Sequence, residues 1–134
     1  MAALRLGFAY FAVVFACGFL LGVLRTLLLE PRLGADAAEL IELPVMTMLC
    51  WVVARRLVAR RPLRRSARLL AGIIALACLL SLEFTVVLAL QGRTLEAWAA
   101  SRASPTGAAW ALSMALFALF PALAAPREPD AASR

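Results

Sequence analysis

The sequence contains no histidine, no lysine and no asparagine. Without histidine, the chain lacks the usual ligand for zinc and haem iron and the commonest general base. It also has no P-loop, no nucleophile elbow and no His-Glu-x-x-His motif. We therefore expect that the protein is not an enzyme and that it carries no cofactor.

Cysteine is scarce, and its three copies, Cys17, Cys50 and Cys78, lie within apolar stretches. An odd number of cysteines in such stretches argues against a disulfide framework, because buried cysteine behaves as a small hydrophobic residue. A soft Cu(I) site is the alternative, since Met46 lies one helical turn from Cys50. Nothing in the sequence brings the three thiols together, so we expect no metal site.

Apolar residues are abundant: they make up 64% of the 134 residues, compared with about half in a soluble domain. A helix needs about 20 mostly apolar residues to cross a hydrocarbon core of roughly 30 Å. Four runs meet this requirement, at residues 6–29, 37–58, 69–90 and 105–125. The predicted fold is an all-α, polytopic four-transmembrane-helix bundle that forms one domain over residues 1–125, followed by a short polar tail at 126–134.

The connections between these runs carry recognisable local signals. Pro31 and Gly34 predict a tight turn over residues 30–35. Residues 94–98 can form a short helix at the membrane interface, with Trp98 as its amphipathic anchor. Ser104 before Pro105 is typical of a helix start, with a capping side chain followed by proline at the first helical position.

The net charge of +6 comes from arginine alone, and half of the 14 arginines fall in one short segment. This basic loop contains Arg55, Arg56, Arg60, Arg61, Arg64, Arg65 and Arg68. Positive residues collect on the cytoplasmic side of membrane proteins, so the loop and both termini are expected in the cytoplasm, an N-in/C-in topology. We expect the lipid bilayer as the loop's neighbour, with anionic headgroups as an open further role, and we expect no nucleic acid. The bias towards alanine and arginine is typical of GC-rich bacterial genes, which favours a bacterial inner membrane.

Small residues predict how the helices pack, because close approach drives helix association in lipid. The fourth run has alanines at spacings of three and four residues, and Ala111, Ala115, Ala118 and Ala122 are expected to face a neighbouring helix. The opposite side, with Trp110, Met114, Phe117 and Phe120, would then meet lipid or a partner protein. Gly18 and Gly22 mark a second expected contact face on the first run.

Four charged residues lie in the outer half of the spans and form a possible intramembrane polar cluster: Arg25, Glu39, Glu42 and Glu83. A charge at the bilayer centre costs roughly 3 kcal/mol on insertion scales, so such groups should pair or reach water. We expect Arg25 to bond Glu42 or Glu83 and the remaining acid to be protonated or to line a polar cavity. The pairing can simply fix helix register, or it can serve binding or transport, since the apolar neighbours of Glu83 suit proton coupling.

Several short motifs together resemble a set of small uncharacterised bacterial four-span proteins. The likeness is carried by Gly22-x-x-Arg25, Pro31-Arg32-Leu33-Gly34, residues 38–44, Glu83 and Gly92-Arg93. This resemblance implies the four-helix fold and brings no activity with it. The sequence leaves two readings of function: a structural or interaction subunit of a membrane assembly, or a small channel or proton-coupled transporter. Either could act as a homo-oligomer.

Overall fold

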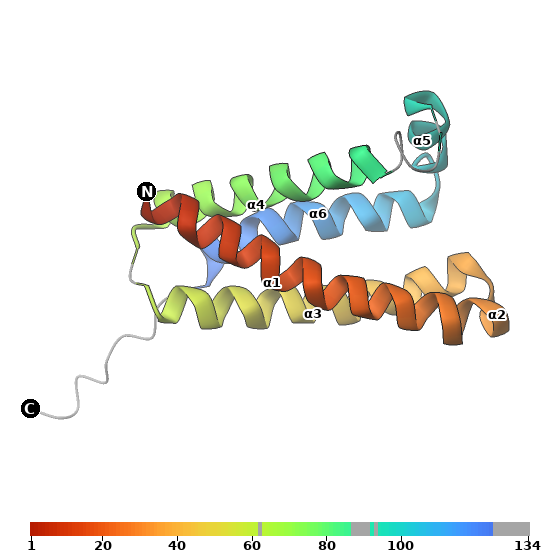
Figure 1. The fold of residues 1–134 in the computed structure, drawn as a ribbon, viewed down its shortest axis with the longest axis horizontal. Helices are drawn as coiled ribbons and strands as arrows, with labels where there is room; N and C mark the ends of the chain where they lie inside the picture. Colours follow the sequence, from red (N-terminus) through yellow and green to blue (C-terminus); the bar gives the residue numbers. More distant parts are fainter. Residues whose placement is uncertain (62, 87–91, 93, 125–134) are drawn as a thin grey trace, which may run out of the picture.

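The computed structural model of the protein is a bundle of long helices with two short helices at one end (Figure 1). It describes residues 1–61, 63–86, 92 and 94–124. In chain order the elements are α1 (Ala2–Leu24), the π-helical turn η1 (Arg25–Leu29), α2 (Glu30–Leu33), α3 (Ala35–Ala59), α4 (Arg65–Thr85), α5 (Leu95–Ser101) and α6 (Pro105–Leu123).

Four helical segments in the described part of the chain are long and apolar enough to cross a membrane. They are Ala2–Leu33, Ala35–Ala59, Arg65–Thr85 and Pro105–Leu123. The all-helical fold and four candidate spans agree with the sequence prediction and suit a multi-pass membrane protein. The predicted end of the third span at 87–90 and the tail at 126–134 lie outside the described residues.

The first helical segment is longer than predicted because the expected turn at residues 30–35 is mostly helical. Pro31 sits near the start of α2, where proline is tolerated, and the chain turns only at Gly34 with φ 82°. Proline cannot donate the usual bond to the preceding turn, and the helix widens into the π turn η1 just before it. The 32 residues from Ala2 to Leu33 measure about 48 Å at 1.5 Å per residue, which is more than the thickness of a bilayer core.

The long helices form a ring in which α4 contacts α1 and α6, and α3 contacts α6 and α1. Helix α1 crosses the bundle obliquely: it starts beside α4 and ends beside α3 (Figure 1). As a consequence, the pairs α1–α3 and α4–α6 separate towards the end that carries α2 and α5. We call this the α2–α5 end, and the opposite end, with the N-terminus and the α3–α4 connection, the arginine end.

The packed core lies in the half of the bundle nearer the arginine end. Tyr10 of α1 is 1% exposed, stacks on Phe117 of α6 with ring centroids 4.7 Å apart, and donates a 3.1 Å hydrogen bond to the Phe117 carbonyl. Ala54, Ala71 and Phe120 are buried around this pair. A buried tyrosine hydroxyl needs such an acceptor, so this contact ties α1 to α6 across the ring.

Glycine is the contact residue at three helix crossings. A methyl group on Gly72 of α4 would overlap the Ala118 carbonyl of α6, and one on Gly7 would crowd Ala71 of α4. Gly18 packs against the Met46 side chain, as the prediction of a contact face requires, whereas Gly22 has open space around it. The predicted role of Gly22 in packing is therefore wrong for this bundle, because α1 has no close neighbour at that position.

The predicted faces of the last span are partly confirmed and partly reversed, since Ala118 meets Gly72 of α4 as expected. Phe117 and Phe120 are buried in the core, and Ala111 and Ala115 are exposed; only Ala122 is buried and Ala118 partly so. The reason is physical: both lipid and a neighbouring helix accept apolar side chains, so an alanine stripe alone does not fix which way a helix turns. Phe117 and Phe120 instead fill the packed core of the bundle.

The basic segment mostly remains at the surface. Arg55, Arg56, Arg60, Arg61, Arg64 and Arg65 are exposed at the ends of α3 and α4 and in the connection between them. Arg68 differs, because it lies in the first turn of α4, is 7% exposed and donates to the Ala124 carbonyl. Its assignment to the loop is therefore corrected: it links the start of α4 to the end of α6.

Candidate functional site

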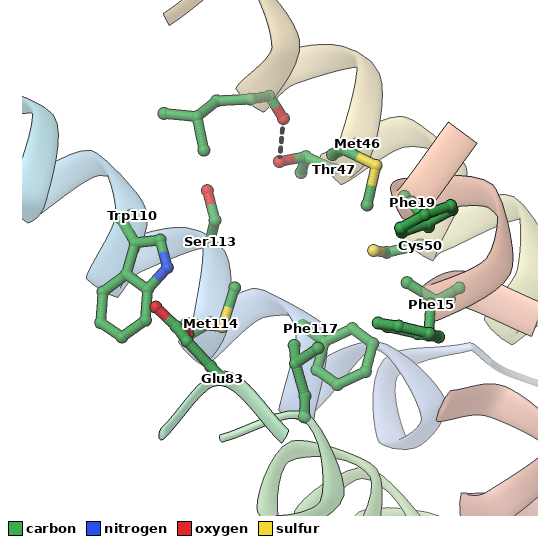
Figure 2. A pocket seen from close by; sticks show the side chains of 14 residues that line it. Phe15, Phe19, Met46, Thr47, Cys50, Glu83, Trp110, Ser113, Met114 and Phe117 are labelled. Carbon is green, nitrogen blue, oxygen red and sulfur yellow. Dashed lines mark hydrogen bonds between the residues drawn. The ribbon is translucent and has the colours of Figure 1, made fainter. Parts of the chain in front are cut away.

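A cavity of about 340 Å³ lies between all four long helices, in the half of the bundle where the helix pairs separate. Its wall is mainly aromatic and aliphatic: Val14, Phe15, Phe19, Leu43, Met46, Leu79, Trp110, Met114 and Phe117, with Gly18 completing the α1 side. Figure 2 shows these side chains arranged around the open space. The cavity follows from the oblique path of α1, since the helix that fills the bundle at the arginine end has moved towards α3 at this level.

Five lining residues carry a hydroxyl, thiol, carboxylate or indole N–H group: Thr47, Cys50, Glu83, Trp110 and Ser113. The hydroxyls of Thr47 and Ser113 donate within their own helices, to the carbonyls of Leu43 at 2.8 Å and Ala109 at 3.0 Å. Glu83 is the charged residue of this wall. The cavity can therefore hold an apolar body while offering one carboxylate at its edge.

Arg25 forms an ion-paired group at the α2–α5 end, which we call the Arg25 cluster (Arg25, Glu30 and Glu42). Its Nη1 lies 2.6 Å from Glu30 Oε1, and its Nε lies 2.7 Å from Glu42 Oε2. The π turn places Arg25 where it reaches both α2 and α3. Arg25 was expected to bond Glu42 or Glu83. It pairs with Glu42, and it also pairs with Glu30, which was not expected.

A second group, the Arg102 cluster (Arg102, Glu39 and Glu83), joins three elements. Arg102 follows α5; its Nη2 lies 3.2 Å from Glu83 Oε1 of α4, and its Nη1 lies 3.5 Å from Glu39 Oε1 of α3. The side chains of all three residues are between one fifth and one third exposed. This pairing lowers the cost of placing Glu83 beside an apolar cavity.

Two tryptophans complete the surroundings of Arg102. Its guanidinium carbon Cζ lies 4.5 Å from the ring centroid of Trp110 and 5.7 Å from that of Trp98. Trp98 also donates from Nε1 to Glu83 Oε1 at 3.3 Å and packs edge-on against Phe84 and Trp110. The short helix α5, capped by Thr94, was expected from the sequence, and its Trp98 is half-buried against α4 and α6.

Sequence reasoning missed Arg102 and Glu30 as members of the charged groups. Arg102 was counted only among the connecting residues, although Trp98 and Arg102 are four residues apart and share a helical face. That spacing was the available signal. The expected helix start at Ser104 is confirmed, since its hydroxyl accepts from the Gly107 amide at 3.1 Å; this cap fixes where the chain passes from α5 into α6.

The chemistry of this region is recognition by charge and by aromatic faces. In the part of the chain that the structure describes, no three His, Cys, Asp or Glu side chains are grouped so that they could hold a metal ion. Cys17, Cys50 and Cys78 are free thiols. No family model, no curated protein and no solved structure matches this chain.

Proposed function

We propose that the protein is a small carrier of an inner membrane that takes a small molecule or proton through the cavity between its four long helices. The observation that carries this proposal is a 340 Å³ cavity whose single carboxylate, Glu83, also belongs to the Arg102 cluster. An acid that is held by a neighbouring arginine and borders an apolar space can exchange its partner as a ligand enters. Membrane carriers in general place their ionisable groups beside cavities within the helix bundle.

The orientation of the carrier is part of the proposal. The exposed arginines gather at the arginine end, which the positive-inside rule assigns to the cytoplasm together with both termini. The α2–α5 end would then face the outside. A reporter that works only in the cytoplasm should therefore be active when it is fused to either terminus.

Flux in liposomes that contain the purified protein tests the carrier function. We expect proton or cation flux with the wild type, and at least a tenfold reduction with Glu83→Gln, since the amide cannot carry the charge of the carboxylate. Glu96→Gln is the matched control, because Glu96 lies on α5 and is exposed. Flux that is the same in all three proteins would contradict the role of Glu83, and the absence of flux from well-folded wild type would contradict the carrier.

A second candidate function is that of a subunit in a membrane assembly. It is favoured by the exposed small-residue face of α6, where Ala108, Ala111 and Ala115 lie at spacings of three and four residues. The partner would be a second copy or a larger membrane protein. No flux in the liposome assay, together with a defined oligomer or a co-purifying membrane protein, would favour this candidate over the carrier.

A further inference from the structure

The position held by the Arg102 guanidinium has the makeup of a site for an organic cation. Two carboxylates, from Glu39 and Glu83, and two indole rings, from Trp98 and Trp110, surround one positive group. Carboxylates attract such a group by charge, and the faces of tryptophan rings attract it through their quadrupole. The α2–α5 end as a whole favours cations, since its described residues include six acidic side chains and three arginines.

Arg102 fills this position incompletely. Its contact distances to the two carboxylates, 3.2 and 3.5 Å, are longer than the 2.6 and 2.7 Å contacts that Arg25 makes. The carboxylates therefore hold the guanidinium of Arg102 less closely than those of the Arg25 cluster hold Arg25.

The cation position is continuous with the cavity. Glu83 and Trp110 form part of the cavity wall (Figure 2), and both also contact the Arg102 guanidinium. A molecule with an apolar body in the cavity would place a charged group at its edge where Arg102 now lies. The apolar wall, with Phe15, Met46 and Phe117, suits aromatic or branched aliphatic groups.

We infer that the ligand of this protein is a lipophilic organic cation, and that Arg102 is an internal competitor which the cation displaces from Glu83 and Trp110. This inference rests on the proposed function, because it names the class of molecule that enters the cavity. Displacement breaks the ion pairs of Arg102 with α3 and α4, whereas Trp98 still holds α5 against α4.

Binding of two probes of the same shape tests the inference. The cation is methyltriphenylphosphonium, and the neutral match is 1,1,1-triphenylethane, in which carbon replaces phosphorus. Tryptophan fluorescence of detergent-solubilised protein reports binding, and a Trp51→Phe background leaves Trp98 and Trp110 as the reporters. We expect the cation to bind about tenfold tighter than the neutral probe, as about 1.4 kcal/mol of charge recognition predicts.

Substitutions then separate charge recognition from occupancy of the cavity. Glu83→Gln should weaken binding of the cation about tenfold and leave binding of the neutral probe unchanged. Arg102→Gln should strengthen binding of the cation several-fold, because it removes the competitor. If Arg102→Gln does not fold, Arg102→Lys takes its place in the test. Lysine retains the charge but loses the planar stacking, so the affinity of this variant for the cation should lie between those of the background protein and a protein without the competitor. Glu96→Gln and Arg32→Gln change the same charges at exposed positions and should leave both affinities as in the background protein.

The outcomes distinguish this inference from the proposed function. Equal binding of both probes, unaffected by Glu83→Gln and Arg102→Gln, would overturn the cation inference and retain the cavity as a binding site. The cation can bind more tightly than the neutral probe and yet gain no affinity in Arg102→Gln or Arg102→Lys. That result would overturn the proposed competition by Arg102. If neither probe binds the folded protein, both the inference and the cavity as a ligand site are contradicted.

Discussion

Arg25 and Arg102 each hold two carboxylates that come from different elements, and they do so at the α2–α5 end of the bundle. The side chains are partly exposed, so each pair contributes less than a buried ion pair and more than one at a free surface. Each arginine compensates acids that would otherwise stand beside apolar helices. The two clusters thus keep an open, charged end compatible with a membrane environment.

Removal of Arg102 should destabilise the protein measurably. Arg102→Gln leaves Glu39 and Glu83 without their cation, and we expect a loss of about 1–2 kcal/mol, intermediate between exposed and buried pairs. Thermal unfolding in detergent, followed by circular dichroism, measures this loss. Arg32→Gln is the control, since Arg32 is exposed on α2; equal stability of the two variants would show that the Arg102 cluster contributes nothing. A lipophilic cation added to Arg102→Gln should restore its stability, because the cation takes the place of the missing guanidinium.

At the scale of single residues, the sequence predicted the Arg25–Glu42 pair of the Arg25 cluster but not the Arg102–Glu83 pair of the Arg102 cluster. Arg25, Glu39, Glu42 and Glu83 could be selected because a charge inside an apolar run is costly and needs a partner. The partner of Glu83 could not be predicted, because it depends on α5 folding back over α4. Tertiary contacts of this kind leave only a weak trace in local spacing, here Trp98 and Arg102 four residues apart.

The helices themselves are held in place by close contacts at small residues. Gly72 of α4 meets the backbone of α6, and Gly7 of α1 meets α4 at the same end of the bundle. In lipid, where no hydrophobic force draws helices together, such close packing is the main source of association. These contacts fix α1, α4 and α6 at the arginine end, while α1 remains free to diverge towards α3 beyond them.

Two glycine substitutions test this account of helix packing. Gly72→Ala should destabilise the bundle by about 1–3 kcal/mol, as expected for overpacking, because the added methyl group overlaps the Ala118 carbonyl. Gly22→Ala makes the same change in a long helix where the space is open, so it should be neutral or slightly stabilising. Unfolding in sodium dodecyl sulfate compares the two. A loss of stability in Gly22→Ala as large as in Gly72→Ala would contradict the crossing geometry.

The positions of the long helices could be predicted from apolar run length, whereas their orientation about their own axes could not. Run length alone decides whether a segment can cross a bilayer. Orientation depends on which face fits a neighbour, and lipid does not penalise an apolar face that points outward. Phe117 and Phe120 therefore lie in the core and Ala111 and Ala115 outside, opposite to the interpretation of the alanine stripe.

The molecule as a whole has a packed half and an open half. Tyr10, Ala71 and Phe117 belong to the packed core near the arginine end, and the cavity, the Arg25 cluster and the Arg102 cluster occupy the other half. This division follows from the oblique path of α1 across the ring. Because the core near the arginine end is closely packed, the open half can admit a ligand while the bundle remains folded.

The central claim is that the transported ligand passes through the cavity between the four long helices. Cys50 tests it directly, because its thiol lies in the cavity wall, whereas Cys17 of α1 is not part of that wall. The measurement is flux in liposomes before and after complete alkylation with N-ethylmaleimide, for one variant that retains only Cys50 and one that retains only Cys17. Our account predicts that alkylation abolishes flux in the Cys50 variant and leaves the Cys17 variant active. Undiminished flux through a protein whose Cys50 is fully alkylated, as measured by mass spectrometry, would contradict it.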